Sequence, residues 1–258
     1  MESEQQNLPA GPKKTNKPLW TAGGIAGLVI VVLIGLVVFM GLKNKSLQDE
    51  VASLAGGAAG QDGGYLRHDM DYGIAVELPA DWRVSSKEAN LQKEKAGADL
   101  ARDSLSMDIS YLNQNTVFSA NSADSSATVQ IVVFDSQMVA ESFLMIRGMT
   151  EQPGGPQNVN QFFRPTLEQA LAAVGTPLVE LRPAEAIELN GEKVLLMSYQ
   201  CKQVGTGVLV EARQYHFCFP KYVVQLTVCW EAAKTAEFQP VLDRLLESMQ
   251  IAAAPAGN

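Results

Sequence analysis

The chain has 258 residues, of which 47% are hydrophobic and 19% are charged, so the composition predicts a folded core and excludes a wholly disordered chain. Lysine and arginine number 20 against 28 aspartates and glutamates, and the resulting net charge of −8 argues against nucleic acid as a partner. The three cysteines contain no CxxC pair, which excludes a disulfide-rich framework and a standard zinc module.

Residues 19–42 form an apolar run of 24 residues without a charge. As an α-helix this run is about 36 Å long, enough to cross a hydrocarbon layer of roughly 30 Å. The alternatives are a cleaved signal peptide, whose apolar region is shorter and followed by a small-residue cleavage site, and a buried soluble helix. The length favours a transmembrane signal-anchor that contacts the lipid bilayer.

Basic residues flank this run unequally. Lys13, Lys14 and Lys17 precede it, whereas Lys43 and Lys45 follow it. The positive-inside rule therefore predicts that residues 1–18 are a cytoplasmic tail. The remainder is expected outside the cytoplasmic (inner) membrane, as a periplasmic domain.

Three glycines of the apolar run, Gly23, Gly27 and Gly35, share one helical face. The Gly23 and Gly27 pair matches the small-xxx-small pattern that lets two membrane helices pack closely, so a homodimer through this helix is one interpretation. The alternative is that glycine is simply common in membrane helices.

A stalk and Gly/Ala-rich linker follow at residues 43–64, and half of Ala55–Gly64 is glycine, which predicts a flexible tether. The folded domain is expected at residues 65–252, with a disordered tail at residues 253–258. The first 64 residues carry equal numbers of acidic and basic side chains, so the whole net charge of −8 falls within the part after the linker. Such an acidic domain is repelled by an anionic lipid surface.

The first half of the domain contains segments whose hydrophobic pattern and composition differ. Alternation predicts strands, polar Lys/Glu-rich sequence predicts a surface helix, and Asn/Ser-rich sequence predicts an exposed loop. In chain order we expect a strand at Tyr72–Leu78, a turn at Pro79–Asp81, a return at Trp82–Val84, a helix at Ser85–Ala101 interrupted near Gly97, a strand at Ser104–Leu112, a loop at Asn113–Ser126 and a strand at Ala127–Asp135.

Two helices are expected next. The first covers Gln137–Thr150 and is apolar around most of its circumference. The second begins at Thr166, because Thr166–Gln169 has the sequence of a capping box, and it ends at Gly175.

The last third predicts a four-stranded meander and a final helix. Asn190-Gly191 is the pair that a two-residue type I′ hairpin requires. The strands are expected at Ala184–Leu189, Glu192–Lys202, Val208–Phe219 and Tyr222–Trp230, and the helix contains Phe238, Val241, Leu242, Leu245, Leu246 and Met249 on one face. Because the strands carry apolar residues on both faces, the fold class is α/β of the α+β type, an α/β/α sandwich with a largely antiparallel sheet.

The opening segment Tyr72–Trp82 resembles the strand and Pro-Ala-Asp-Trp turn that begins PsbP-like domains. Leu189–Lys193, the meander and the terminal Leu246–Met249 are similar to the carboxyl half of the same superfamily. The resemblance covers most of residues 65–252. It implies the PsbP-like fold and an accessory role, and it transfers no catalytic residue.

The sequence contains none of the common catalytic or nucleotide-binding motifs, and no cofactor is predicted. The richest set of reactive side chains is Cys201, His216, Cys218 and Cys229, which strand parity places on one sheet face. In the expected register Cys201 lies opposite Val210 and Cys229 lies opposite Ala212 on the same middle strand. This one strand separates the two cysteines by about 10 Å, which is too far for a disulfide. Buried free thiols are the favoured interpretation, and a metal site using His216 and Cys218 is the alternative.

Three functions remain open on the sequence alone. The favoured one is a membrane-tethered extracytoplasmic accessory protein that binds or assembles another protein without catalysis. An enzyme, either a hydrolase or a redox protein with a site built from scattered carboxylates and His216, is the second. A self-associating structural membrane protein is the third.

Overall fold

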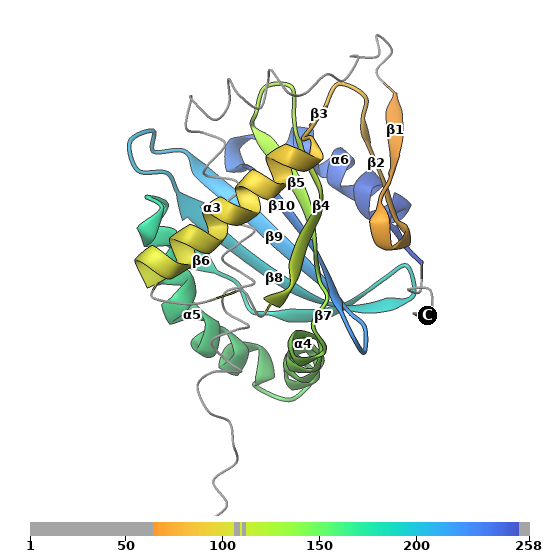
Figure 1. Cartoon of the computed structure of the whole chain (residues 1–258). Helices are drawn as coiled ribbons and strands as arrows, with labels where there is room; N and C mark the ends of the chain where they lie inside the picture. Colours follow the sequence, from red (N-terminus) through yellow and green to blue (C-terminus); the bar gives the residue numbers. More distant parts are fainter. Residues whose placement is uncertain (1–63, 106–108, 110–111, 253–258) are drawn as a thin grey trace, which may run out of the picture.

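The computed structural model describes residues 64–105, 109 and 112–252, which form two antiparallel sheets and four α-helices (Figure 1). The larger sheet has the strand order β3-β4-β5-β10-β9-β8-β6, and β7 also pairs with β8. Its strands are β3 (Arg83–Val84), β4 (Gln114–Asn121), β5 (Ala127–Phe134), β6 (Leu178–Leu181), β7 (Glu185–Leu189), β8 (Glu192–Lys202), β9 (Leu209–Cys218) and β10 (Val223–Glu231).

The meander is confirmed, with β7, β8, β9 and β10 pairing in chain order. At the β7–β8 turn, Asn190 and Gly191 have φ of 53° and 82°, the positive values that a type I′ turn requires. The central strand β5 is buried along its whole length, because helices or a second sheet cover both faces. The predicted largely antiparallel α/β architecture is therefore correct.

A second, three-stranded sheet has the order β1-β2-β11, formed by β1 (Tyr65–Asp69), β2 (Ile74–Pro79) and β11 (Gln250–Ile251). The expected return of the first strand through Trp82–Val84 is wrong. β2 pairs with β1 instead, because the 3₁₀ turn η1 (Asp71–Gly73) reverses the chain ahead of β2. The Arg83–Val84 pair joins the larger sheet beside β4.

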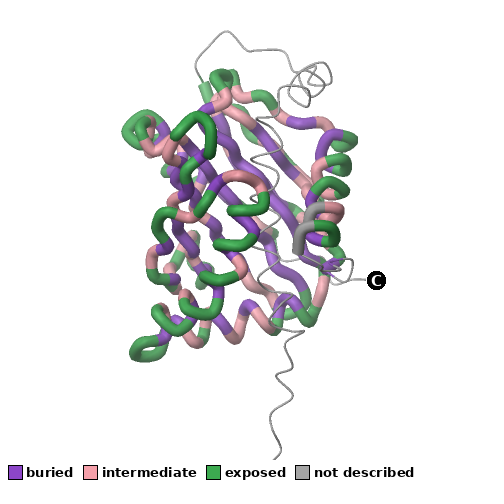
Figure 2. The backbone as a smooth tube through the Cα atoms, turned by 90° about the vertical axis from the view of Figure 1, so that its left-hand side faces the viewer, coloured by how far each residue is buried: buried purple, intermediate pink, exposed green. Residues whose placement is uncertain are grey.

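Helices cover both faces of the larger sheet. On one face lie α3 (Lys87–Leu105), α4 (Gln137–Thr150) and α5 (Gly155–Ala173), which share a core with β8, β9 and β5. On the other face α6 (Thr235–Ser248) and the three-stranded sheet form a second core, in which Phe238, Leu242 and Leu245 are buried. Figure 1 shows α4 and α5 on one side of the sheet and α6 with β1 and β2 on the other, and Figure 2 shows the buried strands between the exposed outer turns.

The segment between β3 and β5 differs from expectation. The helix α3 runs through Gly97 without interruption, since one glycine costs only about 1 kcal/mol in a helix. The strand expected at Ser104–Leu112 is wrong at its start, because Ser104 and Leu105 belong to α3. Residues 106–108 and 110–111 lie outside the described residues, and Ile109 and Leu112 are buried in the core. The expected loop at Asn113–Ser126 is also wrong, because most of it is β4.

The helix α5 begins eleven residues before the expected start at Thr166. Gly154, with φ of 73°, precedes it, and Pro156 lies in its first turn. Proline is tolerated there because the N–H groups of the first turn have no acceptor within the helix. Pro165 lies inside the helix. Burial of an apolar stripe outweighs the cost of this proline, and the stripe consists of Val159, Phe163, Leu167, Ala170 and Leu171.

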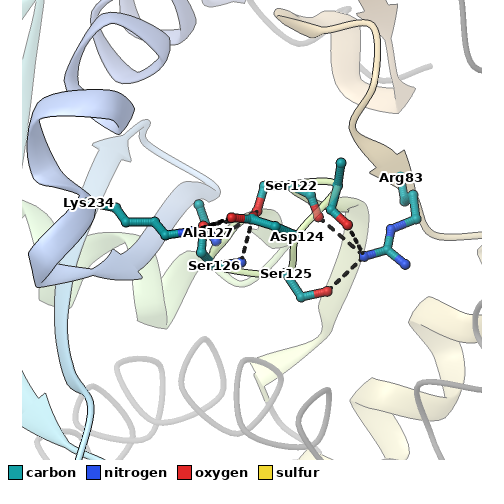
Figure 3. Close-up of polar contacts among 8 residues, drawn as sticks. Arg83, Ser122, Asp124, Ser125, Ser126, Ala127 and Lys234 are labelled. Carbon is teal, nitrogen blue, oxygen red and sulfur yellow. Dashed lines mark hydrogen bonds and ion pairs between the residues drawn. The ribbon is translucent and has the colours of Figure 1, made fainter.

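The β4–β5 turn contains a cluster of polar contacts (Figure 3). The Asp124 carboxylate accepts hydrogen bonds from Lys234 and from the hydroxyl groups of Ser122 and Ser126, and these contacts hold its pKa well below the usual range. On the opposite side of the turn, Arg83 donates to Ser125 Oγ over 2.7 Å. The turn thus joins β3 to the start of α6.

The predicted membrane helix at residues 19–42 lies outside the described residues, as do residues 1–18, the linker up to residue 63 and residues 253–258. The glycines Gly23, Gly27 and Gly35 lie there too. Among the helices that the structure describes, none combines the length and the apolar character needed to cross a bilayer.

Candidate functional site

A polar pocket lies where the amino-terminal half of α3 passes β4. Its volume is about 270 Å³. One face of α3 forms a wall, since its residues recur at positions i, i+3, i+4 and i+7. The lining residues are Asp71 and Tyr72 from η1, Val84 and Ser85 from the end of β3, Lys87, Asn90, Leu91 and Glu94 from α3, and Asn115, Thr116, Val117 and Phe118 from β4.

Lys93 lies directly behind this wall. Its Nζ donates to Ser85 Oγ over 2.8 Å and to Ser119 Oγ over 2.9 Å. Burial lowers the pKa of the Lys93 amine to about 8, because the charged ammonium loses hydration. Among the described residues no carboxylate forms an ion pair with this amine, so its partners are the two hydroxyl groups.

Two oxygen atoms at the pocket are buried and lack a hydrogen-bond partner. They are Asn90 Oδ1 and Thr116 Oγ1, and the Asn90 residue is only 5% exposed. The backbone N–H of Thr116 is already occupied, because it donates to the Glu94 carboxylate. Unpaired buried acceptors are costly, so a molecule in this pocket gains by donating hydrogen bonds to them.

Tyr72 lines the pocket from η1 in a strained conformation. Its φ of 62° and ψ of 17° are left-handed values that a bulky side chain rarely adopts. Burial raises the pKa of its phenol, and the nearby carboxylates of Asp135 and Asp71 raise it further. The following Gly73 also has a positive φ, so two consecutive left-handed residues fix the shape of this edge of the pocket.

The residues proposed from sequence as metal ligands lie elsewhere, on the α4 side of β9. The His216 side chain is completely buried, and its Nδ1 lies 3.3 Å from the carbonyl oxygen of Leu195. Cys218 Sγ contacts the backbone oxygen of His216 at 3.4 Å, not its imidazole. Within the part of the chain that the structure describes, no group of three or more His, Cys, Asp or Glu side chains is placed to hold a metal ion.

The predicted cysteine register is confirmed. Cys201 lies opposite Val210 and Cys229 lies opposite Ala212. Cys201 and Cys229 are buried in the core beneath α4 and α5, Cys218 packs against the same core, and all three thiols are free. Burial raises the pKa of Cys201 and Cys218 to about 12, which keeps both thiols protonated.

Sequence reasoning missed the Lys93 cluster because it placed a correctly predicted helix on the surface and interpreted the β4 segment as a loop. A surface helix at Ser85–Ala101 gives Lys93 no reason to be buried, and a loop at Asn113–Ser126 gives Ser119 no fixed place. The signal that could have revealed β4 is the run Thr116-Val117-Phe118, which combines β-branched and aromatic residues.

The described residues form a mixed α/β domain on a largely antiparallel sheet. A PsbP protein is among the solved structures to which this chain is similar, as its sequence resemblance to PsbP-like domains predicts. Similar solved structures include the cyanobacterial PsbP (CyanoP) of Synechocystis sp. PCC 6803, with 11% identity over 76% of this chain and 98% of that chain and a TM-score of 0.43. LpqN of Mycobacterium tuberculosis, described as involved in cell envelope biogenesis, is also similar, with 14% identity over 74% of this chain and 91% of that chain and a TM-score of 0.39.

The Ran-binding protein Mog1p of Saccharomyces cerevisiae is also similar, with 9% identity over 74% of this chain and 96% of that chain and a TM-score of 0.37. No protein-family model matches the chain, and no curated protein matches its sequence. These likenesses concern the fold, and function is argued from the residues of this chain.

Proposed function

We propose that this chain is a membrane-tethered accessory protein, whose residues 19–42 anchor it in the cytoplasmic membrane and whose folded part binds another protein outside the cytoplasm. The observation that carries the proposal is the order of three segments: a 24-residue uncharged apolar run, a glycine-rich linker and then an acidic folded unit. A flexible linker lets a domain reach partners near a membrane without lying on its surface.

Charge supports the same arrangement. The linker and the preceding residues are electrically balanced, so the folded unit carries the net charge of −8. Anionic lipid headgroups repel such a unit, and this leaves its surface free for a protein partner. Exposed apolar side chains at one end of the larger sheet offer contact area, since Val179 is 55% exposed and Val204 is 72% exposed.

The anchor is tested by adding protease to intact spheroplasts of a bacterium that expresses the full chain with a tag at each end. We expect loss of the carboxyl-terminal tag and survival of a fragment that carries the amino-terminal tag. Protection of both tags until the membrane is broken would contradict the proposed orientation. Release of the full chain by carbonate washing would contradict the anchor itself.

The binding role is tested with a photo-crosslinking amino acid placed at Val204. A discrete crosslinked product in membranes, absent when the same label replaces the exposed Gln152 in the α4–α5 turn, supports a defined partner surface. Crosslinking that is equal at both positions would contradict it.

The hydrolase alternative rests on one separate observation, the contact between Lys93 and Ser85.

A further inference from the structure

Three side chains at the pocket have the arrangement of a serine activated by a lysine. Lys93 Nζ lies 2.8 Å from Ser85 Oγ and 2.9 Å from Ser119 Oγ. Ser85 lines the pocket, whereas Lys93 lies behind it and Ser119 is completely buried. The hydroxyl group of Ser85 is therefore the member of the cluster that a ligand in the pocket meets.

A serine hydroxyl is a weak nucleophile unless a neighbouring base removes its proton. A lysine amine serves as that base only in its neutral form, and ordinary lysines are protonated at neutral pH. Burial lowers the pKa of Lys93 to about 8, so about a tenth of the molecules carry the neutral amine at pH 7. Burial and two hydroxyl partners thus supply what a lysine base requires.

We propose that Ser85 is the nucleophile and Lys93 the general base of a site that hydrolyses an ester or amide bond of a small acyl compound held in this pocket. Ser119 is a positioning residue, because it holds the lysine and does not line the pocket. The inference goes beyond the accessory function and is independent of it.

The reaction balances without a redox partner. Ser85 Oγ forms a bond to the acyl carbon while its proton passes to Lys93 Nζ. The proton then moves to the leaving oxygen or nitrogen as the ester or amide bond breaks, which leaves an acyl group on Ser85. Water attacks this acyl group and gives its proton to Lys93, after which the carboxylic acid leaves and the Ser85 hydroxyl is restored.

The amino end of α3 lies next to the nucleophile, since Ser85 comes two residues before the first residue of the helix. Ser86 accepts hydrogen bonds from the N–H groups of Ala89 and Asn90. The N–H groups of Lys87 and Glu88 have no acceptor within an α-helix, and the helix dipole makes this end positive. Such an end stabilises the negative oxygen that forms on the acyl carbon.

The rest of the pocket indicates the class of substrate. Val84, Val117 and Phe118 supply apolar surface for a short acyl chain. The unpaired oxygens Asn90 Oδ1 and Thr116 Oγ1 accept hydrogen bonds, so they favour a compound with an N–H or O–H donor close to its carbonyl group. An N-acylated amino acid ester or a short peptide has this combination.

Few charges face the Lys93 amine. The ionisable residues of the pocket wall are Lys87 and Glu94 on its own helix and Asp71 and Tyr72 on η1. The Glu94 carboxylate accepts a hydrogen bond from Thr116 N. The strand β4 has no ionisable residue, and Arg83 on β3 is directed to the β4–β5 turn. On α5, the helix that packs beside α3, Arg164 and Glu168 pair with each other.

The test is hydrolysis of p-nitrophenyl butyrate by the purified full chain between pH 6 and 9.5. We expect a rate that rises about tenfold per pH unit below pH 8 and levels off above it. Ser85→Ala and Lys93→Arg should each lower the rate about 100-fold or more. Lys95→Arg and Ser142→Ala, which change an exposed lysine of α3 and a serine of α4, should leave it within about threefold of the wild type.

Lys93→Arg separates catalysis from structure, because arginine keeps the charge and the hydrogen bonds but does not lose its proton. Its thermal unfolding should match that of the wild type while its activity is lost. A fluorophosphonate should add to Ser85, with loss of fluoride, in the wild type and not in Lys93→Arg. Ser119→Ala should move the midpoint of the pH profile, a shift that a purely structural role would not produce.

A wild-type rate equal to that of Ser85→Ala, or full activity in Lys93→Arg, would overturn the inference. The cluster would then be a structural bracket between α3 and β4. Neither result bears on the tether or the partner surface, because the protease and crosslinking experiments give the same outcome with Ser85→Ala if the accessory function is correct.

Discussion

The imidazole of His216 lies almost face to face with the phenyl ring of Phe143, with ring centroids 4.5 Å apart and planes inclined by 26°. The histidine comes from β9 and the phenylalanine from α4, so the contact joins the central sheet to the helix that covers it. Both side chains are completely buried. Burial lowers the pKa of His216 to about 4, so the imidazole in this stack is neutral at neutral pH.

This stack predicts a loss of stability in mild acid. The unfolded chain binds a proton at His216 near pH 6.5, whereas the folded chain resists it until about pH 4. The stabilisation is complete above pH 6.5 and falls as the pH drops from 6.5 to 4, by about 3 kcal/mol in all. Urea unfolding of the full chain at pH 7 and pH 4 should show this loss, and His216→Gln should lack it.

The other histidine of the chain provides the control. His68 lies on β1, is partly exposed, and its ring is tilted by 47° against that of Phe118, with centroids 5.2 Å apart. Burial lowers its pKa as well, but part of the ring remains hydrated, so His68→Gln should remove a smaller share of the acid sensitivity. Parallel pH dependences in the wild type and His216→Gln would show that the imidazole of His216 titrates normally.

The three cysteines should be slow to react in the folded chain. Burial raises the pKa of the Cys229 thiol as it does those of the other two, so the reactive thiolate is scarce at all three positions. We expect less than one thiol to react with Ellman's reagent at pH 8 over the time in which three react after denaturation with guanidinium. Cys218 is only half-buried and should react first, so Cys218→Ser should abolish the early phase. Rapid native labelling in that variant would contradict the burial of Cys201 and Cys229.

The buried carboxylate of Glu211 predicts a selective effect of removing its partner. Arg182 Nη2 donates to Glu211 Oε2 over 3.0 Å, and Gln200 donates to the same oxygen over 2.8 Å. Arg182→Met leaves this carboxylate in a nearly dry site and should lower the free energy of unfolding by about 2 kcal/mol, since Arg182 itself is partly exposed. Adding Glu211→Gln should restore part of the loss.

A surface pair provides the comparison for this measurement. Arg164 and Glu168 form an exposed i,i+4 pair on α5. Arg164→Met should change the free energy of unfolding by less than about 0.5 kcal/mol. Equal losses in Arg182→Met and Arg164→Met would mean that water reaches Glu211 as freely as it reaches the surface pair.

The terminal helix α6 should be essential to the fold. Leu242 is completely buried in the core that α6 shares with β2 and β10, and Leu242→Ala should cost about 3 kcal/mol by leaving a cavity. Asp243→Ala, on the exposed side of the same turn, should be nearly neutral. A chain that ends at Glu237 loses the whole apolar face and should show no cooperative thermal unfolding by circular dichroism. A normal melting transition in that chain would show that α6 is an appendage.

The fold could be predicted from sequence wherever local pattern and tertiary packing agree. The β7–β8 hairpin follows from Asn190-Gly191, because few other residue pairs accept two positive φ values. The assignment failed between Ser85 and Ser126, where polar residues are buried by tertiary contacts, such as Lys93 against Ser119. The predicted start of α5 is wrong because the capping pattern at Thr166 favours a later start, whereas the apolar stripe that the helix buries begins at Val159.

The candidate site could not be predicted from the sequence, because there too the local pattern does not reveal the tertiary packing. The sequence drew attention to His216 and the cysteines because their chemistry is distinctive, and the structure places them in the core. Lysine and serine are too common to draw attention at Lys93 and Ser85, which lie eight residues apart in the chain. Only the packing of α3 on β4 makes that lysine a buried group, and no local pattern specifies such packing.

The three-stranded sheet unites the first described strand of the chain with the last, since β2 lies between β1 and β11. Five residue pairs hold β1, a mostly exposed edge strand, to β2. The strand β2 is in turn fastened to α6, because Glu77 N donates to Ser248 Oγ over 2.9 Å. A pulling force applied to the chain before Tyr65 acts on β1 first. Its pairing with β2 therefore breaks, and the chain lengthens, before the force reaches the larger sheet.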